Sequence, residues 1–250
     1  MSKPIDCCRL VDMAKANGWP VGVNEGGRLV QDGAAVGGSS DVEERELEAQ
    51  SQQALEGIYP NASEELRRYV DILANRGMEW GLLGPREGGR LWQRHVANSL
   101  ALVDVIGSGL DVADVGSGAG LPGLPLAIVR PDLHVTLIEP LLRRSNFLQL
   151  AVDELGLGDR VDVLRARAEE CKATFDVVVC RAVAPLEKLL KWTVPLFRDG
   201  QLVALKGESA EDEIRSASKK VAALGLRAEV LELQAAPGVG RTRAIRVAAG

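Results

Sequence analysis

The 250-residue sequence lacks several features that would place it in a familiar class. Its four cysteines form no Cys-x-x-Cys pair, and with only two histidines they give no zinc-ligand spacing. No run of about 18 apolar residues occurs, and the N-terminal segment has no apolar core of a signal peptide. We therefore expect a cytoplasmic protein with reduced thiols, no metal site and no membrane partner.

Aromatic residues are scarce, at 4%, and positive charge is not in excess. The formal net charge of −5 argues against a protein that holds nucleic acid by a global basic field. Residues 1–60 hold five Lys or Arg against ten Asp or Glu, whereas the remaining residues are balanced. The hydrophobic content of 46% rests mainly on Ala, Val and Leu, and together with the abundant Gly this suits layered α/β packing.

The first part of the chain predicts little regular structure. Residues 20–48 combine glycines, serines and an acidic run without apolar periodicity, so we expect residues 1–60 to be a flexible acidic leader. The alternative is a short helix from Asp41, which would place acids in the first turn. Amphipathic patterns over residues 63–73 and 91–106 predict a small N-terminal helical cap, residues 61–107.

Residues 108–250 alternate between short β-branched runs and helical patterns, which is typical of a parallel sheet with crossover helices. Two later strands, 227–233 and 242–249, are joined by a short Pro/Gly loop after a helix near 211–224, so they must pair antiparallel. We predict an α/β domain with a Rossmann-like seven-stranded sheet that ends in an antiparallel hairpin. The other five predicted strands are 111–116, 134–139, 161–166, 175–180 and 201–207.

A glycine-rich loop follows the first of these strands. Gly116, Gly118 and Gly120 let the backbone turn tightly and approach a ligand without an intervening Cβ. The segment fits both G-x-G-x-G and G-x-G-x-x-G, so nicotinamide, flavin and S-adenosylmethionine binders all remain open. Glu139 ends the next strand, where its carboxylate could accept both ribose hydroxyl protons.

The sequence after residue 139 distinguishes between these cofactor classes. A nicotinamide dehydrogenase would usually continue with a second half or a substrate domain and would need a catalytic Tyr/Lys, His or Cys there. No His and no Tyr follows residue 139. A reversed terminal hairpin, by contrast, is the usual ending of the S-adenosylmethionine methyltransferase fold.

Five segments of the sequence occur together in one known family, and they stand here in this order: RHVANSL (94–100), DVGSGAGLPGLPLAIVRPD (114–132), RAEE (167–170), FDVVVCRAVAPLEKLL (175–190) and ALKG (204–207). Through them the sequence, over roughly residues 61–250, resembles the RsmG methyltransferases, formerly called glucose-inhibited division protein B. These enzymes methylate N7 of one guanine in small-subunit ribosomal RNA. The resemblance implies a class I methyltransferase that uses S-adenosyl-L-methionine.

The resemblance also implies cofactor-binding positions, which together with the loop glycines are Gly116, Gly118, Gly120, Leu121, Glu139, Ala168, Glu169 and Arg181. Two departures fall on the side expected to face RNA: the family often has Asp where Asn98 stands, and usually Asn-Leu-Thr where residues 81–83 are Gly-Leu-Leu. The implied partner is 16S ribosomal RNA, within the small subunit or an assembly intermediate. Because the body of the protein is neutral, we expect modest, salt-sensitive affinity for naked RNA.

N7 of guanine has an exposed lone pair, so methyl transfer to it needs no strong base and we assign none. The candidates for catalytic roles are Arg181 and Lys206, which follow strand ends, and His95. Arg94, Arg143 and Arg144 could face RNA, and the scattered tryptophans are expected to pack in the core. Two alternatives remain: a noncatalytic nucleotide- or RNA-binding module on the same fold, and an NAD-dependent oxidoreductase.

Overall fold

The chain divides into two compact units, Met1–Glu43 and Glu44–Gly250. In the first, β1 (Gly22–Val23) pairs antiparallel with β2 (Leu29–Val30). The second unit carries every residue of the predicted site. The structure, a computed structural model, describes residues 22–23, 29–30, 39–84, 87–197 and 199–250.

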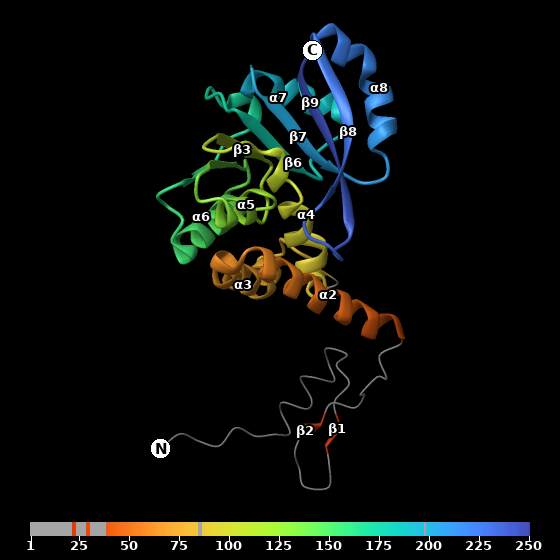
Figure 1. Cartoon of the computed structure of the whole chain (residues 1–250). Coiled ribbons are helices and arrows are strands. Elements are labelled where there is room, and N and C mark those ends of the chain that lie inside the picture. The colour runs from red at the N-terminus through yellow and green to blue at the C-terminus, as the bar shows by residue number, and fades with distance from the viewer. Residues whose placement is uncertain (1–21, 24–28, 31–38, 85–86, 198) are drawn as a thin grey trace. The chain divides into compact units, whose positions relative to one another are not determined.

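The second unit is built on a seven-stranded sheet (Figure 1). Its order is β5-β4-β3-β6-β7-β9-β8; the first five are parallel, and β9 runs antiparallel to both β7 and β8. The predicted sheet and its terminal hairpin are therefore confirmed. The strands are β3 (Asp111–Val115), β4 (His134–Ile138), β5 (Val161–Leu164), β6 (Val177–Arg181), β7 (Gln201–Lys206), β8 (Leu226–Gln234) and β9 (Arg241–Ala249).

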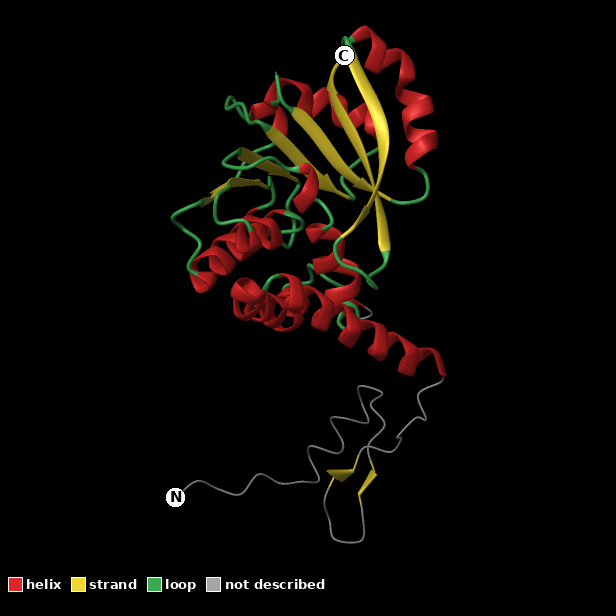
Figure 2. Cartoon of the chain, in the orientation of Figure 1, coloured by secondary structure: helices red, strands yellow, loops and turns green. Residues whose placement is uncertain are grey.

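Helices cover both faces of this sheet, as Figure 2 shows. Side chains alternate between the faces along each strand. In β6, Val177 and Val179 pack in the cluster that contains α3, α5 and α6, whereas Val178 and Cys180 pack in the cluster of α7 and α8. Burial on both faces explains the nearly continuous apolar runs of the strands. The helices are α3 (Ser63–Ile72), α5 (Gly123–Val129), α6 (Leu142–Leu155), α7 (Leu186–Thr193) and α8 (Ala210–Ala223).

A helix of twenty residues, α2 (Ser39–Ile58), occupies the end of the predicted leader. The expectation of a flexible segment is wrong for these residues, and the alternative of a helix near Asp41 is the better one. Acids near its start favour the helix through the backbone dipole, and Leu55 is buried in the core. Residues 1–38 of the leader lie outside the described residues, apart from β1 and β2.

Glu48 on α2 caps a later helical segment, η4 (Leu91–Val96). Its two carboxylate oxygens accept the backbone N–H groups of Trp92 at 2.6 Å and Gln93 at 2.9 Å. The first N–H groups of a helix have no partner within it, so an acid from elsewhere satisfies them. Burial raises the pKa of Glu48.

The helix predicted over 91–106 is interrupted. The segment begins as the π-helical η4, continues as α4 (Ala97–Leu100), and ends in a 3₁₀ turn, η5 (Val103–Val105). The Ser99 hydroxyl donates to the His95 carbonyl at 2.7 Å, which competes with regular helical bonding at this point. Among the described residues, no helix is both long and apolar enough to span a bilayer.

Tyr69 joins α3 to the loop that follows β3. Its side chain is fully buried, and its hydroxyl donates to the carbonyl of Ala119 at 2.9 Å. The helical cap thereby shares a hydrogen bond as well as a hydrophobic core with the sheet.

Replacing Tyr69→Phe should lower the free energy of unfolding by about 1–2 kcal/mol, because the Ala119 carbonyl would stay buried without its donor. Urea titration followed by circular dichroism measures the change. Tyr59→Phe is the control, since Tyr59 packs at the edge of the same core and its hydroxyl has no hydrogen bond to any described residue. Equal losses in the two variants would contradict a role for the buried hydroxyl.

Candidate functional site

The loop after β3 passes through three backbone conformations that favour glycine. Gly116, Gly118 and Gly120 have φ angles of 73°, 58° and 94°. At Gly116 a Cβ would also lie 2.9 Å from Cγ2 of Val183. A side chain there would strain the backbone and displace the segment after β6, so this position requires glycine.

Asp114, near the end of β3, holds this loop in place. Its Oδ2 accepts the N–H of Gly123, the first residue of α5, at 2.9 Å, and its backbone carbonyl accepts the Ser117 hydroxyl at 2.8 Å. The side chain is fully buried, and its Oδ1 has no hydrogen-bond partner among the described residues. Burial raises the pKa of Asp114 to about 7.

Glu139 connects the loops that follow β3 and β4. One carboxylate oxygen accepts the N–H of Gly118 at 3.1 Å, and the other accepts the N–H of Leu141 at 3.0 Å. The side chain is only 2% exposed, and the Arg144 guanidinium lies 3.9 Å from it. Each oxygen keeps a second lone pair for a further donor.

These elements border a cavity of about 670 Å³. It lies at the carboxyl ends of β3, β4 and β6, where open α/β sheets bind ligands, and its size is that of a small-molecule site. Most of the predicted site residues line it: His95, Gly116, Gly118, Leu121, Glu139, Ala168, Glu169 and Arg181.

Two predicted residues do not line the cavity. Gly120 faces α5, because a Cβ there would collide with the side chain of Leu124. The Lys206 ammonium donates to the Ala184 carbonyl and to Glu213 Oε2, both at 2.7 Å. Lys206 therefore ties the segment after β6 to α8.

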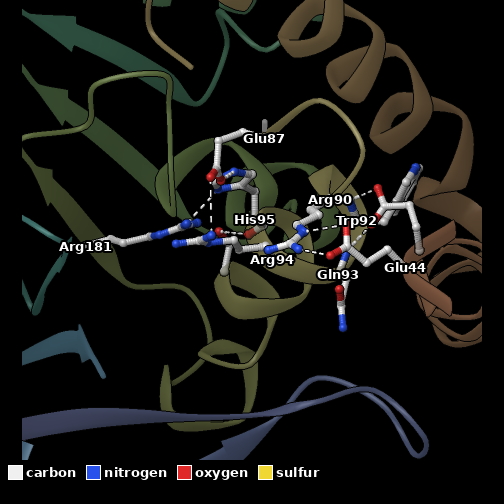
Figure 3. A network of polar contacts seen from close by, with 10 residues as sticks. Glu44, Glu87, Arg90, Trp92, Gln93, Arg94, His95 and Arg181 are labelled. Carbon is white, nitrogen blue, oxygen red and sulfur yellow. Dashed lines mark hydrogen bonds and ion pairs between the residues drawn. The ribbon is translucent and has the colours of Figure 1, made fainter. Parts of the chain in front are cut away.

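Arg181, the last residue of β6, contacts His95 although 86 residues separate them (Figure 3). Its Nη2 lies 2.6 Å from His95 Nδ1, and His95 Nε2 lies 2.8 Å from Glu87 Oε2. Nη1 of Arg181 is buried and has no hydrogen-bond partner among the described residues. Burial lowers the pKa of Arg181.

The cavity also includes residues that the sequence did not predict. Ala182, with a φ of 53°, turns the chain after Arg181 so that Val183 covers Gly116. Trp192 of α7 packs against the core, as expected of the tryptophans, but it also lines the cavity. Lys188 Nζ lies 5.0 Å from the centre of its ring. Leu82 and Leu83 line it too, and their only signal was the departure from the family at 81–83.

None of the described cysteines lines this cavity, and the described residues form no cluster of metal ligands there. Cys171 and Cys180 are free thiols, and burial raises the pKa of Cys180 to about 12. No group of three or more His, Cys, Asp or Glu side chains within those residues is placed to hold a metal ion. Cys7 and Cys8 lie outside the described residues.

A family model described as GidB, rRNA small subunit methyltransferase G, matches residues 62–239. The chain belongs to this family. A methyltransferase G of Mycolicibacterium vanbaalenii is 51% identical over 70% of this chain and 78% of the relative, and that of Mycolicibacterium smegmatis is 52% identical over 67% and 73%. The crystal structure of P. horikoshii TYW2 in complex with MeSAdo has a TM-score of 0.50 at 17% identity, and covers 62% of this chain and 64% of that one.

Membership of the methyltransferase G family confirms the resemblance inferred from the motifs. It also confirms the predicted class of enzyme, an rRNA methyltransferase that depends on S-adenosylmethionine. The fold is that of the methyltransferases, with the terminal hairpin in the predicted place. Neither the oxidoreductase nor the noncatalytic module accounts for these findings as well.

Asp114 should make stability depend on pH. Its pKa is 3.8 as a free group and about 7 in the fold, so between these values the native state keeps a proton that the unfolded state has released. This contribution to the free energy of unfolding is therefore complete below about pH 4 and is lost as pH rises to about 7.

We expect Asp114→Asn, which keeps an acceptor for Gly123, to lose this contribution to the pH dependence. Urea titrations of both proteins at intervals from pH 4 to 8 measure it, and the difference between them removes the effect of other groups. Parallel pH profiles in the two proteins would contradict a buried, protonated Asp114.

Proposed function

We propose that this protein transfers a methyl group from S-adenosyl-L-methionine to N7 of a guanine in 16S ribosomal RNA. The observation that carries the proposal is one cavity, in a member of the methyltransferase G family, into which a glycine loop, a buried carboxylate and a buried guanidinium converge. Those groups are Gly116 to Gly118, Glu139 and Arg181. They come from three strand ends, as the sequence predicts.

The described residues fit the cofactor group by group. Glu139 would accept the ribose hydroxyls, since its oxygens keep free lone pairs after binding Gly118 and Leu141. Ala168 and Glu169 would border the adenine, and Gly116, Gly118 and Leu121 would face the rest of the nucleoside. Arg181 has a buried N–H group without a partner, which suits the cofactor carboxylate. Gly120 would act indirectly, by shaping the loop.

S-Adenosylmethionine supplies a methyl group on a sulfonium, and N7 of guanine offers a lone pair that needs no deprotonation. The protein's task is therefore to align donor and acceptor, an effect that contributes up to about 7–11 kcal/mol in well-oriented reactions. We assign no catalytic base. Of the catalytic candidates, Arg181 would bind the cofactor, His95 contacts Arg181, and Lys206 supports the segment that follows β6.

Recognition of the RNA is proposed to depend on its shape more than on charge. Arg143, Arg144 and Arg167 are exposed, and Arg144 and Arg167 also line the cavity, yet the chain as a whole carries a net charge of −5. Few phosphate contacts give modest, salt-sensitive affinity. We therefore propose the small ribosomal subunit or an assembly intermediate, in the cytoplasm, as the substrate. In the protein we propose three parts: a leader (1–60) that includes the helix α2, a helical cap (61–107) and a catalytic domain (108–250).

Incubation with a labelled methyl donor and small subunits that lack the modification should label one guanine at N7. Mapping the label by nuclease digestion and mass spectrometry identifies base and atom together. Unstructured fragments of the same RNA should be labelled more slowly. Equal rates on fragments and subunits would contradict recognition of assembled RNA, and label on another base would overturn the proposed acceptor.

Glu139→Gln should weaken binding of S-adenosylhomocysteine about 10- to 100-fold, because a hydrogen bond to a charged group contributes about 1.5–3 kcal/mol. Calorimetry measures the affinity. Asp162→Asn is the control, since it removes an equal charge from an exposed position on the neighbouring strand β5. NAD should bind to neither protein, and an unchanged affinity in Glu139→Gln would remove this residue from the site.

A further inference from the structure

We propose that Glu87 and His95 are positioning residues that hold the Arg181 guanidinium in one orientation at the cavity. They do so through a directed chain of hydrogen bonds, drawn in Figure 3, that runs from Arg181 to His95 and on to Glu87. The inference rests on the proposed function, in which Arg181 contacts the cofactor. It adds two residues from the helical cap to the machinery of that site.

The chemistry of the three side chains determines which atom donates and which accepts in each of these hydrogen bonds. A guanidinium only donates, so His95 Nδ1, 2.6 Å from Arg181 Nη2, must accept and cannot carry a proton. The proton of a neutral imidazole then sits on Nε2, which lies 2.8 Å from Glu87 Oε2. Glu87 thereby selects the one neutral tautomer of His95 that can receive Arg181.

Charge and burial keep His95 neutral. Its ring is buried, and burial together with the Arg181 cation lowers the pKa of His95 to about 4. Two further charged groups act on the ring: Glu87 raises the pKa of His95 and Arg94 lowers it, and Arg94 Nη1 lies 3.3 Å from Glu87 Oε1. Near pH 7 the imidazole is therefore a fixed acceptor.

This arrangement leaves the charge of Arg181 available to a ligand. Arg181 has no carboxylate within ion-pair distance among the described residues, and its Nη1 remains unpartnered. A neutral acceptor orients a guanidinium without neutralising it, whereas a carboxylate in the place of His95 would compete with an anionic ligand. Both ring nitrogens of His95 are engaged, Nδ1 by Arg181 and Nε2 by Glu87, so His95 acts on a ligand through Arg181.

Contacts from α2 hold in place the segment that bears His95. Glu48 caps η4, the segment that bears His95, and Glu44 contacts Arg90 at the start of the same segment. Figure 3 shows the contact between Glu44 and Arg90 beside the network. These contacts from α2 hold the segment that bears His95 from the side away from Arg181's strand, in addition to the hydrogen bond with Arg181 itself.

A pair of substitutions tests the acceptor role. The Oδ1 of Asn can occupy the position of His Nδ1, whereas Leu offers no acceptor. We expect His95→Leu to weaken binding of S-adenosylhomocysteine about 10- to 100-fold and His95→Asn by no more than about threefold. His134→Asn, at an exposed position that begins β4 at the opposite end of the sheet, should leave binding unchanged.

A double-mutant cycle distinguishes a role of His95 in positioning Arg181 from a role in the stability of the fold. If His95 acts through Arg181, His95→Leu should have no further effect on affinity in the Arg181→Ala background. An undiminished effect in that background would overturn the inference, as would equal losses in His95→Leu and His95→Asn.

A spectroscopic readout needs no ligand. Nitrogen-15 shifts of the two histidines, assigned by the His134→Asn variant, report the tautomer of His95 directly. Protonation at Nε2 that persists from pH 8 to about pH 5 supports the inference, and protonation at Nδ1 overturns it. If the unaltered protein failed to bind S-adenosylhomocysteine while these shifts agreed, the proposed cofactor would be wrong and the hydrogen-bond chain would stand.

Discussion

The site depends on one buried carboxylate. Glu139 binds the backbone of the glycine loop through Gly118 and the backbone after β4 through Leu141. The two N–H groups satisfy the buried carboxylate, and through it the two loops are held together. The same carboxylate therefore shapes the cavity that it also lines.

The helical segments that precede the sheet reach the pocket at two places. Tyr69 bonds to the glycine loop through Ala119, and His95 bonds to Arg181 at the end of β6. Both contacts join residues far apart in the chain to backbone or side chains at the strand ends. A common sheet thus supplies the general form of a cofactor site, and this family's cap supplies the contacts that set how its arginine points.

The glycine loop, Glu139 and Arg181 could be predicted from the strand pattern, whereas Ala168 and Glu169 were implied only by the resemblance to the family. A glycine loop, Glu139 and Arg181 each come directly after an apolar run, and parallel strands bring their carboxyl ends to one edge. The same logic failed to distinguish Lys206, which also follows a strand but turns to Glu213 on α8. Glu87 and Trp192 could not be found this way, because their roles depend on helix packing that no local periodicity encodes.

The contact between Glu48 and η4 bears on how the protein should be shortened for biochemical work. A boundary chosen at residue 60, where composition becomes ordinary, would remove both oxygens that satisfy the backbone of Trp92 and Gln93. Such a fragment would keep the whole sheet and its glycine loop. The backbone N–H groups of Trp92 and Gln93, at the start of the segment that carries His95, would lose their hydrogen-bond acceptor. Trimming should therefore stop before α2, at residue 38.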